Sequence, residues 1–329
     1  MKMRKLGSLT VSEIGMGCMG FSHGYGKIPS EDYSIEAIRK ALDYGCNFLD
    51  TSEAYGPYMM QTGHNEKIVG KAIKGRREDV VLATKMFIGT GEVKRGGSAY
   101  DALRKHLEAS LKRLQTDYAD LYYLHRINPN VPVEYVAEGM GKLIEEGLIR
   151  GWGLSMVTTD FIDRAHRVTP VSAVQNIYSM MERDYEKKVI PYCQKNNIGF
   201  VSFSPIASGY LSGKVTTETK FAGDDVRKWV PQLRKENIIA NQPFLNLVTD
   251  MAEKKHATNA QISLAWMLHK YPHVVPIPGS KNQERILENL AAWDVELSEE
   301  EFQELEDALA HIPVYGQRKE VNMGSEYID

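Results

Sequence analysis

The sequence is poor in features that mark secreted and membrane-spanning proteins. Its 329 residues include only three cysteines, Cys18, Cys46 and Cys193, and no C-x-x-C pair. A disulfide framework is therefore not expected, and reduced thiols in a cytoplasmic protein are the prediction. No stretch reaches about 18 consecutive apolar residues, which argues against a membrane span. Residues 1–7 are basic, but no apolar segment of the kind that a signal peptide needs follows them.

The charge and the histidine spacing argue against three further classes of protein. The net charge is −3 with a pI near 6.3, and the basic residues are scattered, so neither nucleic acid nor an anionic membrane is an expected partner. The nine histidines show no H-E-x-x-H or comparable spacing, so no metal site is predicted and a metal hydrolase is disfavoured. No low-complexity linker divides the chain, and we expect one domain across residues 1–329. The sequence carries no signature of an oligomeric state.

What the sequence does contain is a regular alternation of short apolar runs with helical patterns. The apolar runs, which are typical of buried parallel strands, cover residues 13–16, 47–50, 80–85, 120–125, 151–155, 173–175, 199–204 and 274–277. The helical patterns cover residues 30–45, 66–73, 100–114, 133–146, 159–167, 184–196, 243–256, 259–270 and 298–310. Eight alternations predict a closed (β/α)8 TIM barrel of parallel strands, which needs only about 250 residues.

Two segments depart from this rhythm. Residues 5–11 indicate a tight β-hairpin that turns at Gly7 and Ser8, and it is expected to cap the amino-terminal floor of the barrel. Residues 208–241, after the seventh strand, form a long loop rich in Gly, Lys and Asp. Because loops of this length are usually lids or binding loops, we expect a functional role for it.

Residues 15–20 read G-M-G-C-M-G and match the dinucleotide-binding pattern G-x-G-x-x-G. That pattern requires a helix to begin at once, so that its N-terminus meets the pyrophosphate. Here a loop of residues 21–30 intervenes. We therefore interpret these glycines as a strand end whose backbone passes close to a ligand, and a doubly wound sheet is disfavoured.

Four ionisable side chains lie at or just after predicted strand ends: Asp50, Tyr55, Lys85 and His125. Because the carboxyl ends of barrel strands gather at one face, these side chains are predicted to meet in one pocket. A lysine about 4 Å from a phenol favours the phenolate by about 4 kcal/mol at an effective dielectric near 20. A net fall of about one to three units in the pKa of Tyr55 is therefore expected. Asp50 would keep Lys85 charged, and neutral His125 would orient a substrate oxygen.

Residues 50–56, D-T-S-E-A-Y-G, resemble the Asp-to-Tyr motif of the aldo-keto reductase superfamily. Lys85 and His125 match that family's Lys and His, residues 121–126 and 148–155 resemble its strand motifs, and the similarity covers about residues 6–289. The resemblance implies NADPH-dependent reduction of an aldehyde or ketone to the alcohol, by hydride transfer from nicotinamide. It also implies that Tyr55 is the general acid, that Lys85 and Asp50 tune it, and that His125 orients the carbonyl.

The later strand ends predict where the cofactor binds. Residues 204–214 resemble the family's pyrophosphate loop, and residues 278–285 join a strand end to a helix start, where backbone N–H groups favour phosphate. Arg285 with Glu288 and Asn289 matches the family's adenosine-end motif, which favours NADPH, although the strictness of NADPH over NADH stays open. The predicted cofactor residues are Gly20, Asp50, Ser155, Gln175, Phe203, Ser204, Ile206, Gly209, Leu211, Lys214, Gly279, Ser280, Lys281, Arg285, Glu288 and Asn289.

Apolar side chains near the same face are predicted to wall the substrate pocket: Met19, Phe21, Phe87 and Trp229. They indicate a small carbonyl compound of hydrophobic or mixed character, which the sequence does not name. Two alternatives stay open. One is a non-catalytic barrel subunit that senses a nicotinamide cofactor. The intact set of four ionisable side chains argues against this alternative. The other is an aldolase that uses Lys85 as a Schiff-base nucleophile.

Overall fold

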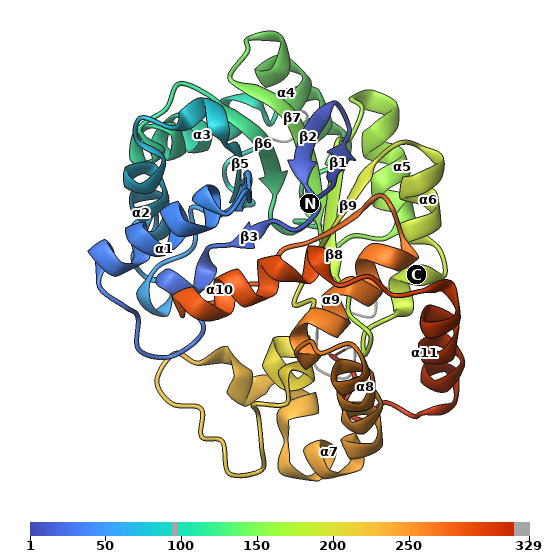
Figure 1. Cartoon of the computed structure of the whole chain (residues 1–329). Helices are drawn as coiled ribbons and strands as arrows, with labels where there is room; N and C mark the ends of the chain where they lie inside the picture. Colours follow the sequence, from blue (N-terminus) through green and yellow to red (C-terminus); the bar gives the residue numbers. More distant parts are fainter. Residues whose placement is uncertain (94–97, 319–329) are drawn as a thin grey trace.

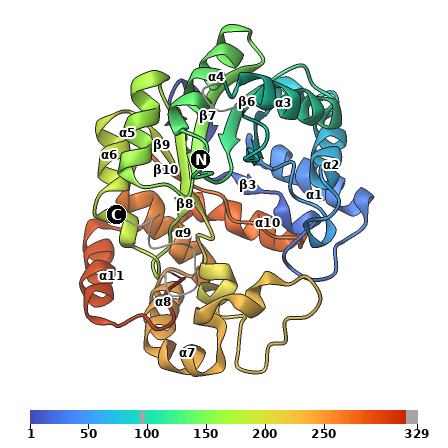
Figure 2. The same ribbon diagram turned by 180° about the vertical axis from the view of Figure 1, so that it is seen from behind.

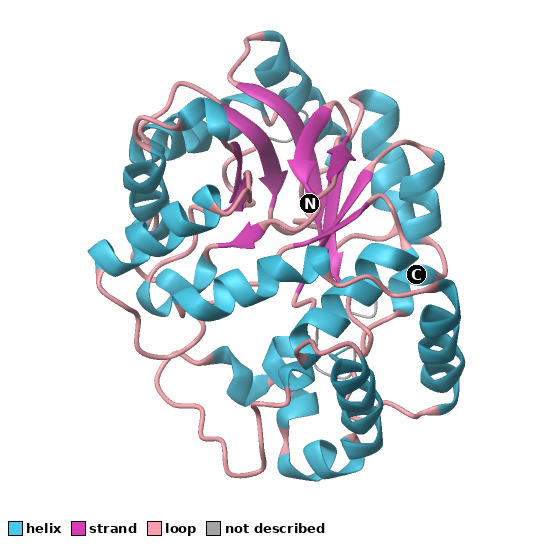
Figure 3. Ribbon diagram, viewed as in Figure 1, coloured by secondary structure: helices cyan, strands magenta, loops and turns pink. Residues whose placement is uncertain are grey.

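The computed structural model describes residues 1–93 and 98–318, and its framework is a curled sheet of eight parallel strands surrounded by helices (Figures 1 and 3). The strands are β3 Met16–Gly17, β4 Phe48–Asp50, β5 Val81–Met86, β6 Ala119–Leu124, β7 Ile149–Ser155, β8 Ala173–Ile177, β9 Gly199–Phe203 and β10 Val274–Pro276. They pair in sequence order from β3 to β10, so the predicted (β/α)8 fold is confirmed.

Helices follow the strands around the outside of the sheet, as the rear view in Figure 2 also shows. The helices are α1 Glu31–Asp43, α2 His64–Ile73, α3 Tyr100–Leu114, α4 Val133–Glu145, α5 Thr159–Val168, α6 Val189–Lys195, α7 Lys235–Ala240, α8 Gln242–Lys254, α9 Asn259–Lys270, α10 Gln283–Leu290 and α11 Glu299–His311. In the described part of the chain, none of them is long and apolar enough to cross a membrane.

The central strands are buried on both faces. Every residue of β6 is buried, with Tyr122 packed outward among the helices and Tyr123 packed inward in the barrel interior. Strands with both faces covered are typical of parallel sheets, and they read as continuous apolar runs rather than alternating ones. That property explains why the strands could be located from the sequence.

The N-terminal hairpin closes one end of the barrel, as predicted. Strands β1 Met3–Leu6 and β2 Leu9–Ser12 pair antiparallel, and Gly7 in the turn has a positive φ of 59°. Leu6 is fully buried in the interior cluster and packs against Gly199, the first residue of β9. Because β9 begins there, the hairpin lies at the amino-terminal ends of the strands, and the opposite face is left open.

The glycines at the start of the chain join the two ends of the sheet. Gly17 forms a parallel bridge with Gly279, and the Gly15 N–H donates to the Pro276 carbonyl at 2.9 Å. A Cβ on Gly17 would lie 3.0 Å from the Ile277 carbonyl oxygen. Gly15 and Gly17 thus make a close approach to the last strand, whereas the predicted approach of this backbone to a ligand stays a prediction.

Most predicted boundaries lie within two residues of the observed ones, and two elements differ by more. The first strand was expected at residues 13–16 but is β3, Met16–Gly17. The helix expected at residues 184–196 divides into a 3-10 turn, Asp184–Glu186, and α6. Pro191 accounts for the division, because proline fits the first turn of a helix but clashes with the carbonyl four residues earlier in a helix interior.

The segment expected as a long loop, residues 208–241, carries short helical turns. They are η5 Ala207–Ser212, η6 Val226–Trp229, η7 Pro231–Leu233 and the short helix α7. The extended part before η6 is drawn in gold at the lower edge of Figure 1. The segment lies next to the β3–α1 loop, because the Val226 N–H donates to the Gly24 carbonyl at 3.0 Å.

Candidate active site

Asp50, Lys85 and Tyr55 form a connected group at the carboxyl ends of β4 and β5. Lys85 is completely buried, and its Nζ donates to Asp50 Oδ1, to the Thr51 carbonyl at 2.8 Å and to the Tyr55 hydroxyl at 3.3 Å. These three acceptors match the three N–H groups of an ammonium. Asp50 also accepts from Gln175 Nε2 at 2.8 Å, which fixes the orientation of the carboxylate.

The charges in this group follow from burial and pairing. Burial lowers the pKa of Lys85, but Asp50 and Tyr55 outweigh that effect, so the pKa is raised and the ammonium stays protonated. Burial raises the pKa of Tyr55, and Lys85 only partly opposes this rise. The predicted net fall in the pKa of Tyr55 is therefore wrong for this structure, because the desolvation of a phenolate outweighs the neighbouring ammonium.

His125 follows β6 and lies beside the same group. Its ring is 5.7 Å from that of Tyr55 in an edge-on arrangement and stacks on Phe87 at 4.5 Å. Burial, together with the charges of Lys85 and Arg126, holds the pKa of His125 well below its usual range, so the imidazole is neutral. Ser52 Oγ lies 3.1 Å from His125 Nδ1 and fixes the ring from behind. The other ring nitrogen, Nε2, is left to bind a substrate oxygen.

The loop that carries Tyr55 is fixed from outside the barrel by Glu53. One carboxylate oxygen of Glu53 accepts from the Phe87 N–H at 3.3 Å, and the other lies 2.9 Å from His106 Nδ1 on α3. His106 Nε2 in turn lies 2.9 Å from Glu92 in the loop after β5. The ring of His106 therefore links the two loops that border the group.

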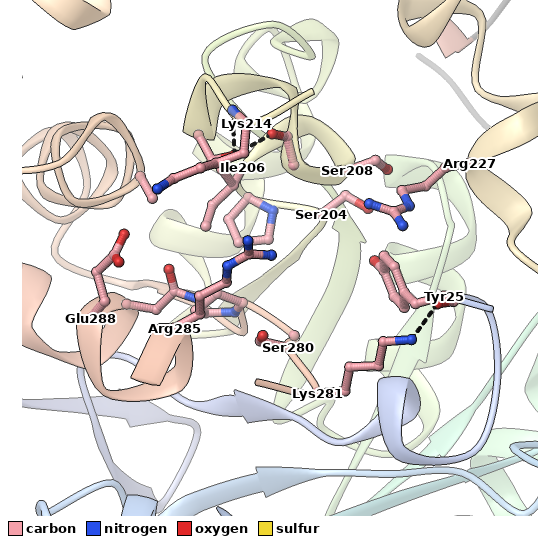
Figure 4. Close-up of a pocket in the computed structure, with 17 residues that line it drawn as sticks. Tyr25, Ser204, Ile206, Ser208, Lys214, Arg227, Ser280, Lys281, Arg285 and Glu288 are labelled. Atoms are coloured by element: carbon pink, nitrogen blue, oxygen red, sulfur yellow. Dashed lines mark hydrogen bonds between the residues drawn. The ribbon is translucent and has the colours of Figure 1, made fainter. Parts of the chain in front are cut away.

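A cleft of about 160 Å³ opens at the same face and is lined by the loops that follow β9 and β10, together with Tyr25, Arg227 and residues of α9 and α10. Its wall includes four cationic side chains, Lys214, Arg227, Lys281 and Arg285, against one carboxylate, Glu288. Figure 4 shows Tyr25 and Lys281 on one side of the cleft and Arg285 with Glu288 on the other. Such an excess of positive charge in a cleft favours an anionic ligand.

The loop after β9 has an unusual backbone. Ser204, Ala207 and Ser208 have φ values of 52°, 46° and 55°, and Gly209 follows at 94°. Non-glycine residues in this region cost of order 1–3 kcal/mol each and tend to occur at functional sites. Successive backbone N–H groups in such turns can form a concave anion site. The conformation therefore agrees with the pyrophosphate loop that the sequence indicated.

Most of the predicted cofactor residues lie around the cleft. Those that line it are Ser204, Ile206, Gly209, Lys214, Gly279, Ser280, Lys281, Arg285, Glu288 and Asn289. Lys281 Nζ donates to the carbonyls of Tyr25 and Lys27 at 2.7 and 2.6 Å, so this ammonium ties down the β3–α1 loop. Among the described residues, no acceptor lies within hydrogen-bonding distance of the exposed Arg285 guanidinium.

The other predicted cofactor residues lie outside the cleft. Ser155 accepts from Arg126 Nη1 at 3.0 Å, and Phe203 is half-buried at the end of β9. A Cβ on Gly20 would lie 3.7 Å from the Lys281 backbone nitrogen. Leu211, in contrast, is fully buried in the main core, where it does not face the cleft.

The predicted substrate wall is only partly brought together. Phe87 is 38% exposed and covers His125, whereas Trp229 is 69% exposed on η6. Met19 is half-buried in the β3–α1 loop. Phe21 is completely buried among the side chains between the sheet and α1, so it contributes to the core instead of to an open wall.

Sequence reasoning did not single out Ser52 and Tyr25 as site residues. Ser52 lies within the quoted motif, but its contact with His125 depends on the pairing of β4, β5 and β6. Tyr25 lies in the β3–α1 loop, and the Arg227 guanidinium lies 5.2 Å from its ring centre. A contact between a residue near the start of the chain and one in the long loop has no local sequence signal.

Comparison with known proteins places the chain in a family. The family model described as the aldo/keto reductase family matches residues 13–310, which is most of the chain. The chain belongs to this family. Members of the aldo/keto reductase family are oxidoreductases that use a nicotinamide cofactor, so the NADP(H) prediction agrees with the family.

Solved structures of similar proteins support the same assignment. A thermostable aldo-keto reductase crystallised with the inhibitor epalrestat is 30% identical, with a TM-score of 0.73 over 94% of this chain and 100% of that one. A glycerol dehydrogenase from Gluconobacter oxydans is 26% identical, with a TM-score of 0.81 over 94% and 95%. An aldo-keto reductase from Klebsiella pneumoniae in complex with NADPH is 28% identical, with a TM-score of 0.72 over 93% and 95%.

Proposed function

We propose that the protein reduces an aldehyde or ketone to the alcohol, with NADPH as the reductant and Tyr55 as the proton donor. When bound, NADPH supplies the hydride that reduces the carbonyl carbon. The observation that carries the proposal is the contact of 3.3 Å between the Lys85 ammonium and the Tyr55 hydroxyl, beside a cleft lined by cations. A cleft lined by cations and a proton source thus lie at the same face of the barrel.

The chain's own residues account for the proton transfer. As negative charge develops on the carbonyl oxygen, Tyr55 transfers its hydroxyl proton to that oxygen and becomes a phenolate. The Lys85 ammonium, held by Asp50, stabilises the phenolate that remains. Neutral His125 orients the same oxygen by donating from Nε2, in the tautomer whose Nδ1 accepts from the Ser52 hydroxyl.

The Klebsiella enzymes solved with NADP or NADPH support a nicotinamide cofactor in the cleft. We assign the adenosine end to the N-terminus of α10, where Arg285 is an exposed cation without a partner among the described residues. The 2′-phosphate of NADPH would pair with this guanidinium. One domain across residues 1–329 and a cytoplasmic location stay predictions.

Two alternatives are less well supported by the contacts. An aldolase needs a neutral lysine amine as its nucleophile. The pKa of Lys85 is raised by its pairing with Asp50 and Tyr55, and all three of its N–H groups have acceptors. A subunit that only senses the cofactor has no need for a buried Asp50–Lys85 pair directed at a tyrosine. Borohydride trapping with a carbonyl compound would label Lys85 only if the aldolase hypothesis is right.

The role of Tyr55 is tested by Tyr55→Phe, which removes the transferable proton and keeps the ring. We expect kcat to fall by about 10²- to 10⁴-fold, measured as loss of NADPH absorbance with 4-nitrobenzaldehyde, while the Kd for NADPH is unchanged. Tyr58→Phe is the matched control, because Tyr58 is an exposed phenol in the same loop. Near-wild-type turnover in Tyr55→Phe would reject this residue as the acid.

The role of Arg285 is tested by comparing the two cofactors. Arg285→Ala should weaken NADPH by about 10-fold or more and NADH much less, because only NADPH carries the 2′-phosphate. Both Kd values are measured by cofactor fluorescence, so NADH is the internal control. Equal weakening of both cofactors would remove the 2′-phosphate assignment.

A further inference from the structure

Arg318, at the end of the described chain, carries a guanidinium that the mechanism above does not use. It lies beyond α11, yet its side chain returns to the open face of the barrel. Its backbone N–H donates to Glu182 Oε1 at 2.9 Å, and its Nη2 donates to Ser208 Oγ. Its Nε is buried and has no hydrogen-bond partner among residues 1–93 and 98–318. The guanidinium therefore has an unused donor that is withheld from water.

The side chain of Arg318 is partly buried, and the groups around it compensate its charge only in part. Burial lowers the pKa of Arg318, and the charges of Glu182 and Tyr25 oppose this fall only in part. Among the described residues, no carboxylate forms an ion pair with this guanidinium. The neighbouring carboxylate, Glu182, accepts two hydrogen bonds at Oε1, one from the Arg318 backbone N–H and one from Gln232 Nε2 at 2.7 Å. Buried charges are normally paired, and an unpaired one is costly.

The contact with Ser208 places this cation at the cleft. Ser208 lines the cleft and belongs to the loop of residues with positive φ after β9. Burial raises the pKa of Tyr25, another residue of the cleft wall, and the charges of Arg318 and Arg227 oppose that rise. A different arginine influences Tyr55. Besides Lys85, it is Arg126 whose charge lowers the pKa of Tyr55. Arg318 does not itself line the cleft, but it contacts the cleft wall through Ser208, in the loop predicted to bind the cofactor's diphosphate.

We propose that Arg318 binds the cofactor's diphosphate, an inference that rests on the proposed function. Its guanidinium attracts a phosphate oxygen of the cofactor through its charge, while its Nη2 keeps its contact with Ser208 Oγ. Because Ser208 accepts from Arg318, its own hydroxyl proton is free to donate to the same phosphate oxygen. The segment after α11 is thereby connected to the cofactor, and the unpaired guanidinium gains the anion that the described residues do not supply.

The experiment compares Arg318→Ala, Arg318→Lys and wild type by cofactor fluorescence. Arg318→Ala should raise the Kd of NADPH and of NADH by the same factor, about 10- to 100-fold, because both cofactors carry the diphosphate. Arg318→Lys should restore part of the affinity, since it keeps the charge and loses the planar fork. Arg167→Ala is the matched control, because Arg167 is an exposed arginine on α5 that pairs with Asp163.

Other outcomes would overturn the proposal. Weakening of NADPH alone would place Arg318 at the 2′-phosphate. Unchanged Kd values with a raised KM for 4-carboxybenzaldehyde, but not for 4-nitrobenzaldehyde, would make it a substrate-carboxylate residue. A lower Tm without cofactor, with the NADPH-induced rise in Tm intact, would show a purely structural role. A wild-type protein that binds neither cofactor would overturn both proposals, whereas normal wild-type binding with unaffected variants would overturn this one alone.

Discussion

His106 is expected to make the stability of the protein depend on pH above neutrality. Its two ring nitrogens each lie 2.9 Å from a carboxylate, one of Glu53 and one of Glu92. Only the imidazolium has an N–H on both nitrogens, so the neutral ring would turn one of these contacts into a repulsion between lone pairs. The hydrogen bond with Glu53 is the largest cause that raises the pKa of His106, from 6.5 to about 9.

The sign and size of the effect follow from this shift. Because the pKa in the folded state is above that in the unfolded state, the stabilisation is complete below about pH 6.5 and is lost as the pH rises through about 9. A gap of this size corresponds to an upper bound of about 3 kcal/mol. The side chain is 23% exposed, so solvent screening reduces the contribution, and we expect about 1–2 kcal/mol.

The assay is urea unfolding of wild type and His106→Gln at pH 6 and at pH 9.5. The variant should be about 1–2 kcal/mol less stable at pH 6, and the difference should shrink toward zero at pH 9.5. His269→Gln is the control, because His269 stacks on Phe302 and, among the described residues, its carboxylate contact is with Glu299, whose side chain is 83% exposed. A stability difference for His106→Gln that is constant across this range, or that grows with pH, would refute the reasoning.

Two further substitutions test a buried ion pair and a close backbone contact, both by urea unfolding at pH 7. Lys85→Met should destabilise the protein by about 3–5 kcal/mol, because it leaves Asp50 buried without its counter-ion; a loss below about 1 kcal/mol would contradict the ion pair. Gly70→Ala should cost about 1–3 kcal/mol or more, because its Cβ would lie 2.6 Å from the Leu114 carbonyl oxygen. Gly91→Ala, with no atom within 4 Å of the added Cβ, is the control for Gly70→Ala, and equal effects of the two would refute the packing argument.

The strand order and the central group of side chains could be predicted because their signals are local. A parallel strand buried on both faces is a short apolar run, and the polar residue that ends it lies at the open face of the barrel. Asp50 and Lys85 were located by this rule, although β5 continues to Met86. Their pairing then follows from neighbouring strands, since β4 and β5 lie side by side.

The residues that sequence reasoning missed depend on contacts between distant segments. The contact of Arg318 with Ser208 joins the end of the described chain to the loop after β9, across 110 positions. The contact of Tyr25 with Arg227 joins two irregular loops. Irregular segments have no periodicity from which their path can be predicted. Such contacts become visible only when the path of each loop over the barrel is known.

The pKa of Tyr55 was misjudged for a physical reason that also clarifies its role. The prediction counted the attraction between an ammonium and a phenolate but gave too little weight to the removal of water from a buried phenol, which is the larger effect here. In the proposed reduction, the general acid must hold its proton until the carbonyl oxygen becomes basic, so the raised pKa of Tyr55 is compatible with that proposed role. Lys85 then matters most after proton transfer, because its charge acts on the phenolate and hardly on the neutral phenol.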